Sequence, residues 1–239
     1  MNIFAIGDLH LSHLSEKPME IFGSQWFDHM TQIKNNWKQS VLEEDIVLLP
    51  GDISWGMRLE EAKEDLSFIA ALPGKKVCIR GNHDYWWDRP GKLNQLYPNL
   101  YFLQNTAVRI GDIAICGTRG WSLVPDEKHL EQQKKLLERE KMRLKLSLEH
   151  ALKQNIQEIW VMLHYPPTNE KEKASIFTEL IEQYPVTKVI YGHLHDRMSW
   201  QNALQGTYGK VTYYLASADY LSFKPIKIGA ITKKHIEME

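Results

Sequence analysis

Residues 77–84 read Val-Cys-Ile-Arg-Gly-Asn-His-Asp, a short apolar run that ends in a glycine and three polar side chains. The length of the run and its β-branched residues favour a buried strand over a fragment of helix. The same pattern, an apolar run that ends in glycine or polar residues, recurs along the chain. We therefore expect strands at 2–6, 46–49, 77–79, 113–116, 159–163 and 188–191.

Helical patterns separate several of these runs. We expect helices at 26–42, 59–71, 127–154 and 173–183, and further strands at 100–103, 107–110, 211–215 and 226–231. Strands that alternate with helices, followed by a strand-rich C-terminal part, indicate an α/β sandwich with mixed sheets. No repeat or linker interrupts the sequence, so we expect residues 1–239 to form a single domain. The helix at 127–154 has one apolar stripe and charges of both signs elsewhere, which predicts solvated charged faces.

The composition is that of an ordinary globular protein. The chain has 239 residues, of which 43% are hydrophobic and 25% are charged, and its formal net charge is −1. No apolar run approaches the ~18 residues needed to cross a bilayer, and an acid at position 8 argues against a signal peptide. Two cysteines are too few for a disulfide framework or a cysteine-rich zinc site. We expect a cytoplasmic protein without a membrane partner.

Polar side chains follow five of the predicted strands, at the point where each strand ends. In an open α/β sheet, functional groups collect in the crevice beyond the carboxyl ends of the strands, so we expect these side chains to meet. Glycines adjoin them, where the chain must turn sharply or pass close to a ligand. The residues concerned are Asp8, His10, Asp52, Asn82, His83, Asp84, His164, His193 and His195.

Seven of these side chains have the chemistry of metal ligands, being four imidazoles, two carboxylates and one amide. One tetrahedral zinc ion needs only about three or four ligands, so the set fits two divalent or trivalent metal ions with one bridging carboxylate. We assign the bridge to Asp52, because it stands alone on its loop. Nitrogen and oxygen ligands suit Mn, Fe, Zn or Co, and the choice among them stays open. The seven predicted ligands are Asp8, His10, Asp52, Asn82, His164, His193 and His195.

A pair of metals forms the clamp used for in-line displacement at phosphorus. The metals lower the pKa of a shared water, so that metal-bound hydroxide can attack, and they neutralise charge on the phosphoryl oxygens. We therefore predict a hydrolase that acts on a phosphomonoester or a phosphodiester. His83 exceeds the metal count, and its place beside Asn82 suits a general acid that protonates the leaving oxygen. We expect Asp84 to accept a hydrogen bond from the other ring nitrogen of His83.

At these motifs the sequence resembles the calcineurin-like metallophosphoesterase family. The motifs span residues 8–195, about four fifths of the chain, and occur in the order found in that family. The resemblance implies a four-layer sandwich, in which two mixed β-sheets are flanked by helices. It also implies one metal site of Asp8, His10, Asp52 and His195, a second of Asp52, Asn82, His164 and His193, and an acid dyad of His83 with Asp84.

The residues after Gly51-Asp52 bear on the substrate. They read Ile-Ser-Trp-Gly-Met, where the protein-phosphatase branch of the family carries Asp-Arg-Gly. The chain looks more like small bacterial phosphohydrolases, so we expect a small-molecule phosphate ester or nucleotide. Arg119 follows a strand and could bind a phosphate with two donors, although an ion pair within the fold explains it equally well. Packing of the site wall is favoured over stacking on substrate for Trp55, Tyr85, Trp86 and Trp87.

Two other functions are compatible with the same motifs. A metal-dependent nuclease would need a basic groove, and the net charge of −1 gives it no support, so nucleic acid is not the expected partner. A non-catalytic protein-interaction module would be expected to lose ligands, yet every ligand position is filled. A protein partner stays open. We expect the remaining histidines to lie outside the site, on the surface or in loops: His13, His29, His129, His150 and His235.

Overall fold

The computed structural model contains two β-sheets, and it describes residues 1–239 apart from 15–16, 170–172, 232–235 and 238–239. The first sheet has five strands in the order β11-β1-β2-β3-β4. Its inner strands are parallel, and β11 pairs antiparallel with β1, which makes the sheet mixed. Its strands are β1 (Asn2–Ala5), β2 (Ile46–Leu49), β3 (Lys75–Cys78), β4 (Leu100–Phe102) and β11 (Ile226–Ala230).

The second sheet has seven strands in the order β12-β5-β6-β7-β8-β10-β9. Its centre, β6 to β10, is parallel, and antiparallel pairs close both edges. The two sheets are connected near the site by an isolated bridge between Gly7 and Ser217. The strands are β5 (Val108–Ile110), β6 (Ile113–Thr118), β7 (Glu158–Leu163), β8 (Val186–Tyr191), β9 (Gly206–Tyr208), β10 (Val211–Leu215) and β12 (Ile236–Glu237).

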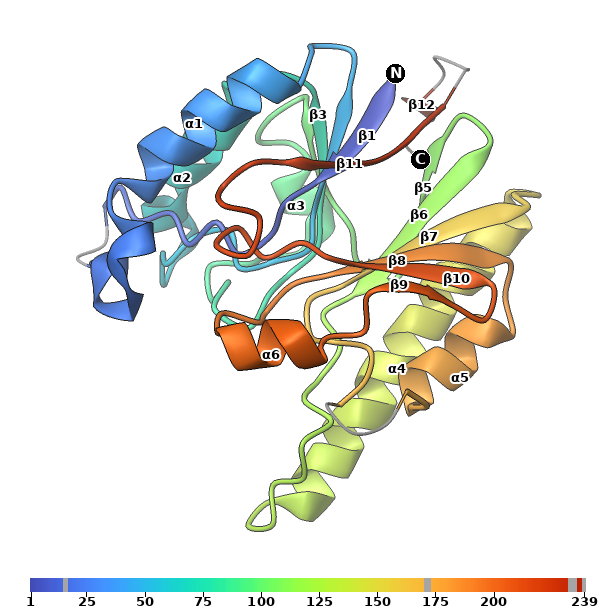
Figure 1. Cartoon of the computed structure of the whole chain (residues 1–239). Helices are drawn as coiled ribbons and strands as arrows, with labels where there is room; N and C mark the ends of the chain where they lie inside the picture. The colour runs from blue at the N-terminus through green and yellow to red at the C-terminus, as the bar shows by residue number, and fades with distance from the viewer. Residues whose placement is uncertain (15–16, 170–172, 232–235, 238–239) are drawn as a thin grey trace.

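Helices cover the outer face of each sheet, which gives four layers (Figure 1). Helices α1 (His29–Ser40) and α2 (Leu59–Ala70) pack on the first sheet, and α4 (Leu130–Lys153) and α5 (Ile176–Glu182) pack on the second. A third buried cluster lies between the sheets, where Leu48 of β2 joins the same apolar layer as Met162 of β7. The four-layer sandwich with two mixed sheets is therefore confirmed.

The structure contains the ten predicted strands and the four predicted helices, with small shifts at their ends. Helix α1 begins at His29 and not at residue 26, because Asp28 adopts a left-handed backbone (φ 49°) that no helix continues through. Several short elements have no periodic pattern and are additional: η1 (Met19–Phe22), η2 (Ser24–Trp26), α3 (Pro90–Leu93), α6 (Arg197–Asn202), β9 and β12. Within the described residues, no helix has both the length and the apolar character that crossing a membrane requires.

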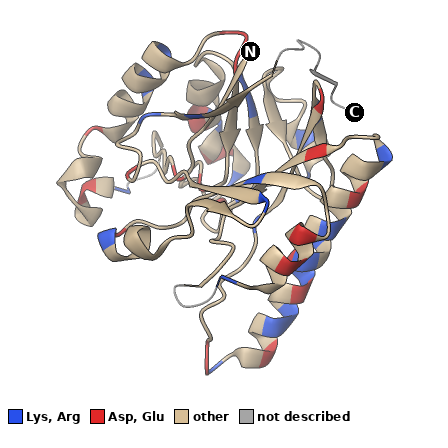
Figure 2. Ribbon diagram, turned by 45° about the vertical axis from the view of Figure 1, so that its right-hand side comes forward, with Lys and Arg blue, Asp and Glu red and all other residues tan. Residues whose placement is uncertain are grey.

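Helix α4 carries alternating basic and acidic residues along its outer face (Figure 2). The expectation of solvated charges is wrong for Glu140, which is fully buried. Its carboxylate accepts hydrogen bonds from Thr118 Oγ1 at 2.6 Å and from Arg143 Nη1 at 2.8 Å. It also lies 3.7 Å from Arg119 Nη2. A carboxylate buried with these donors ties α4 to the end of β6, next to the loops described below.

Candidate metal centre

The loops that follow β1, β2 and β8 hold the predicted ligands in unusual backbone conformations. Four of these residues have a positive φ: Asp8 (53°), His10 (46°), Asp52 (51°) and His193 (74°). Such conformations cost energy in residues other than glycine, and they persist only where the surroundings fix the backbone. Here the chain from Asp8 to His10 is hydrogen-bonded to the β2 loop, with His10 N–H donating to the Asp52 carbonyl at 3.0 Å.

Two glycines allow the carboxylates to approach the neighbouring loops. A Cβ at Gly81 would overlap Asp52 Oδ1, and a Cβ at Gly192 would overlap Asp8 Oδ2, each well inside 3.0 Å. Main-chain N–H groups bind the same carboxylates: His83 N–H donates to Asp52 at 2.8 Å, and His193 N–H donates to both oxygens of Asp8 at 3.0 Å. The carboxylates are thus oriented by backbone donors as well as by packing.

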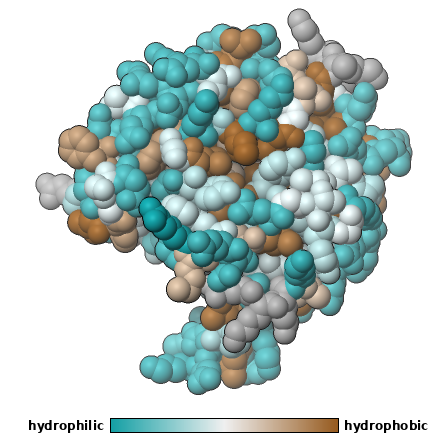
Figure 3. Space-filling model, viewed as in Figure 1, coloured by the Kyte–Doolittle hydropathy of each residue, from teal (hydrophilic) through white to brown (hydrophobic). Residues whose placement is uncertain are grey.

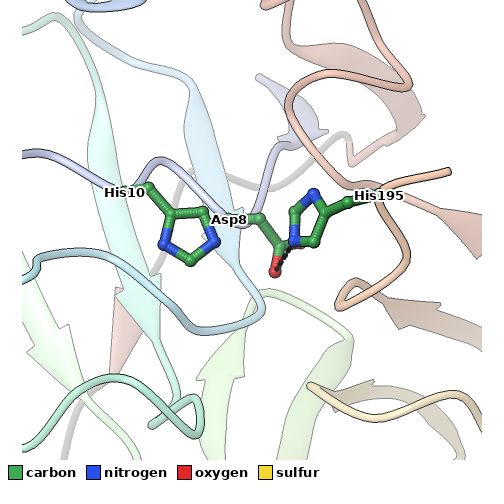
Figure 4. Close-up of side chains that lie close together, drawn as sticks. All are labelled: Asp8, His10 and His195. Carbon is green, nitrogen blue, oxygen red and sulfur yellow. Dashed lines mark ion pairs between the residues drawn. The ribbon is translucent and has the colours of Figure 1, made fainter. Parts of the chain in front are cut away.

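The first group of possible metal ligands consists of Asp8, His10 and His195, whose donor atoms lie within 4.8 Å of one another. Asp8 and His10 come from the loop after β1, and His195 comes from the loop after β8 (Figure 4). His195 Nε2 lies 3.6 Å from Asp8 Oδ1. All three side chains point toward one place, although they are far apart in the sequence.

The second group consists of Asp52, His164 and His193, again with donor atoms within 4.8 Å of one another. Asn82 belongs beside it, because its Oδ1 lies 2.6 Å from His164 Nε2. Asp52 reaches both groups: its Oδ2 lies 3.4 Å from His164 Nε2 and 3.8 Å from His10 Nε2. All seven side chains predicted as ligands therefore lie together.

The nitrogen and oxygen atoms of the second group are arranged in a way that fits a cation between them. His164 Nδ1 lies 3.0 Å from the carbonyl oxygen of Pro50, which can only accept, so Nδ1 carries the proton. Burial lowers the pKa of His164, so the ring is neutral and its Nε2 offers a lone pair. That lone pair faces the Asn82 oxygen at 2.6 Å and His193 Nδ1 at 3.2 Å. Acceptors that converge in this way fit a positively charged ion.

The electrostatics of Asp52, His193 and His10 also fit bound cations. Burial, reinforced by the neighbouring Asp8, raises the pKa of Asp52 to about 8. Burial lowers the pKa of His193 to about 3 and lowers the pKa of His10 as well. His10 Nδ1 is buried without a hydrogen-bond partner among the described residues. Cations would stabilise the paired carboxylates, and neutral imidazoles are the form that binds metal.

Asp219 is a site residue that the sequence motifs do not include. Its carboxylate contacts His195 Nδ1 at 3.1 and 3.2 Å. Burial lowers the pKa of His195, but the hydrogen bonds to Asp219 and Asp8 outweigh it and raise the pKa to about 10. A carboxylate behind a histidine fixes the ring orientation of a metal ligand. The signal was present in the sequence, since Asp219 follows the strand predicted at 211–215 as the other acids follow theirs.

His83 lies at the centre, but Asp84 does not support it as expected. The His83 ring is half-buried, 4.4 Å from the Trp55 ring and 5.7 Å from the His10 ring. No hydrogen bond joins the His83 ring to Asp84 in the described part of the chain. The Asp84 oxygens instead accept backbone N–H groups, at 2.9 Å from Asp52, 2.9 Å from Ile53 and 2.7 Å from Gly81. Asp84 therefore joins two ligand loops. The expectation that it accepts a hydrogen bond from the His83 ring is wrong, because backbone amides occupy its carboxylate oxygens.

Arg119 is held by the fold itself. Its guanidinium lies 3.7 Å from Glu140 and 4.6 Å from the Trp121 ring centre, with only 14% of the side chain exposed. Its carbonyl oxygen accepts the N–H groups of His164 and Tyr165 at 3.0 Å each. These contacts correspond to the ion pair within the fold, which was one of the two expectations for Arg119.

The other aromatic and histidine residues lie partly in the site wall, partly in the core and partly on the surface. Trp55 packs in the site wall, as favoured, and stacks on His10 at 4.9 Å. Trp86 and Trp87 instead pack in the core, and Tyr85 is 52% exposed. His29 is buried, not on the surface, and its Nε2 contacts the His10 carbonyl oxygen at 3.3 Å. The remaining histidines are His13, whose ring contacts Asp65 at 2.6 Å, His129, which is exposed, His150, which is half-buried, and His235, which lies outside the described residues.

Comparison with known proteins agrees with this geometry. The family model "Calcineurin-like phosphoesterase" matches residues 1–197, and the chain belongs to this family of metal-dependent phosphoesterases. It is 31% identical over 113 residues to the Gene 66 protein of Mycobacterium phage D29; the match covers 46% of this chain and 55% of that protein.

Two solved structures show the same fold. Phosphopantetheinyl hydrolase (PptH) from Mycobacterium tuberculosis is 14% identical, with a TM-score of 0.51 and 95% of each chain covered. The calcineurin-like phosphoesterase YfkN from Bacillus subtilis is also 14% identical, with a TM-score of 0.50; the match covers 99% of this chain and 87% of that one. At this identity the likeness concerns the fold.

Proposed function

We propose that this protein is a phosphoesterase with two metal ions, bridged by Asp52. The observation that carries the proposal is the position of Asp52 Oδ2, 3.8 Å from a histidine of the first group and 3.4 Å from one of the second. One carboxylate in reach of both ligand sets is what a shared ligand requires. The first ion would be held by Asp8, His10, Asp52 and His195, and the second by Asp52, Asn82, His164 and His193.

The chemistry at this centre is hydrolysis of a phosphoric ester. Bound metal ions would lower the pKa of a water, so that it can attack phosphorus, and would neutralise charge on the phosphoryl oxygens. His83 stands next to the ligands without being needed as one, and we assign it the proton donated to the departing oxygen. Burial, with the neighbouring His164, lowers the pKa of His83, which makes its protonated form a stronger acid but a less populated one at neutral pH.

We further propose a small-molecule substrate, a phosphate ester or nucleotide, and a cytoplasmic setting. The site is a hollow walled by Trp26 and Trp55 rather than a groove of basic side chains. Both cysteines, Cys78 and Cys116, are free and buried, as in a reducing compartment. The charge of −1 gives no support to a nuclease.

Metal content and turnover, measured on the same preparations, test this function. Protein purified with Mn²⁺ should hold about two ions per chain and hydrolyse p-nitrophenyl phosphate. Asp52→Asn should lose both ions and nearly all turnover, since Asp52 serves both groups. Asp88→Asn is the matched control, because Asp88 is a partly exposed acid paired with Lys92 on the surface. An Asp52→Asn protein that keeps two ions and full turnover would contradict the proposal.

A further inference from the structure

Two hollows share His193 as a lining residue. The acid-side hollow, of about 160 Å³, contains the candidate centre and is lined by His83, Trp55 and Trp26, among others. The distal hollow, of about 210 Å³, lies next to His193 and Leu194 and is bounded by α6 and by residues 122–124 and 165–168. A phosphorus atom bound at the centre would therefore have space for an organic group in two directions.

The acid-side hollow has an aromatic wall around His83. The Trp55 ring stacks on His10 at 24° and lies 4.4 Å from His83, and its Nε1 donates to Met19 Sδ at 3.1 Å. Trp26 contacts His10 edge-on at 5.9 Å. Hydrophobic residues continue outward over η1 and η2, at the left edge of the face in Figure 3. A leaving alcohol protonated by His83 would rest its organic part on this wall.

The distal hollow has a different chemistry. Its polar side chains are uncharged, such as Ser122, Thr168 and Asn202, and apolar side chains such as Leu204 fill the spaces between them. None of its lining residues, within the described part of the chain, is Asp, Glu, Lys or Arg. A second phosphate would need a cationic partner there. An uncharged group, part polar and part apolar, fits instead.

We propose that the substrate is a phosphodiester, with its leaving alcohol in the acid-side hollow and an uncharged organic group in the distal hollow. This inference rests on the proposed function. His83 lines only the acid-side hollow, so the alcohol that receives its proton departs there. Water adds its oxygen to phosphorus, the bond to the leaving alcohol breaks, and the proton released by water restores His83. The product is a monoester that keeps the distal group.

Three substrates that all release p-nitrophenolate isolate the role of the distal hollow. They are p-nitrophenyl phosphate, bis(p-nitrophenyl) phosphate and the p-nitrophenyl ester of thymidine 5′-phosphate, assayed on metal-loaded full-length protein. We expect kcat/KM for both diesters to exceed that for the monoester by about tenfold or more, because only a diester has a group to place in the distal hollow. A monoester used at least as well as both diesters would overturn the proposal.

Variants of the distal wall complete the test. Ala203→Phe should fill the hollow and lower the diester-to-monoester ratio of kcat/KM by about tenfold. Met198→Phe is the control, because Met198 lies in the adjoining helix α6, is 68% exposed and does not line the hollow. Ser122→Phe, from the opposite wall, replaces Ala203→Phe if that variant does not fold.

The possible outcomes distinguish this inference from the proposed function. An unchanged ratio in the wall variant that folds would overturn the inference, as would release of p-nitrophenolate from the monoester alone. Absence of metal-dependent release from all three substrates would instead contradict the proposed function. A ratio that falls in the wall variants and is kept in Met198→Phe supports the inference.

Discussion

Gly192→Ala should remove one metal ion of the pair. The added Cβ would lie well inside 3.0 Å of Asp8 Oδ2, with Cγ at 3.1 Å and Oδ1 at 3.3 Å, so the carboxylate group as a whole must move. The Asp8 carboxylate is fully buried and fixed by His193 N–H. To reach an ordinary contact distance from the new Cβ, it would have to move away by about 1 Å. Metal–ligand distances tolerate only about 0.2 Å, so Asp8 would cease to be a ligand of the first ion.

The expected result is a fall from about two ions per chain to one, with at least about 100-fold weaker affinity at the first site. Metal content by mass spectrometry after dialysis, with titration of Mn²⁺ into the metal-free protein, measures both. Gly91→Ala is the control, because nothing lies within 4 Å of its new Cβ. Unfolding of the metal-free proteins reports separately the overpacking cost of about 1–3 kcal/mol. Two ions at wild-type affinity in Gly192→Ala would refute this account of the glycine.

Three further predictions concern His83, the bound metal ions and Lys76. His83→Ala should keep both ions but lose about 100-fold or more in turnover of alkyl phosphates and less for p-nitrophenyl phosphate, whose leaving group needs no proton; equal losses would count against the acid role. Chelation of the metals should lower the thermal midpoint, since ligand at 100 times its dissociation constant stabilises by about 2.7 kcal/mol per site; an unchanged midpoint would argue against bound ions. Lys76 is fully buried, and desolvation lowers its pKa from 10.5 to about 8. Below pH 8 the folded protein must hold a charged, desolvated Lys76, which lowers the free energy of unfolding. This cost is relieved as the pH rises from 8 to 10.5, so stability increases over that range. Lys76→Met should therefore raise the free energy of unfolding in urea at pH 7, by at most about 3 kcal/mol, and a variant less stable than the wild type at that pH would oppose this explanation.

The strands and the ligand positions could be predicted from the sequence because they share one signal. An apolar run that stops at glycine and an acid, amide or histidine marks both the end of a buried strand and a residue at the edge of the sheet. Asp8, Asp52, Asn82 and His164 were found in this way, and the structure brings them together. Within one sheet the pattern needs no knowledge of packing, because the ends of parallel strands meet on the same side. That His164, after β7 of the second sheet, reaches Asp52, after β2 of the first, depends on how the two sheets pack.

The sequence did not predict the burial of Glu140 or the partners of Asp84, because both depend on which groups surround the acid in the fold. Glu140 sits in a run of mixed charge, and only the packing of α4 against β6 shows that its carboxylate is buried with Thr118. Asp84 follows His83 directly, which suggested a contact between their side chains. The turn carries the Asp84 carboxylate inward to the amides of the neighbouring loop. Adjacency in sequence does not determine the direction in which a side chain leaves a loop.

The three buried acids of the centre share one structural role, and it explains why Asp8 and Asp52 can bind a metal whereas Asp84 cannot. Asp8 accepts the N–H of His193, Asp52 accepts the N–H of His83, and Asp84 accepts N–H groups from the loop after β2. Each carboxylate therefore connects two loops that are distant in the sequence. For Asp8 and Asp52, the second oxygen or lone pair stays available to a metal, whereas the Asp84 oxygens are taken by amides and by Trp86 Nε1. The number of backbone donors that reach an acid thus separates a possible ligand from a purely structural residue, and it follows from how neighbouring loops pack rather than from the motif.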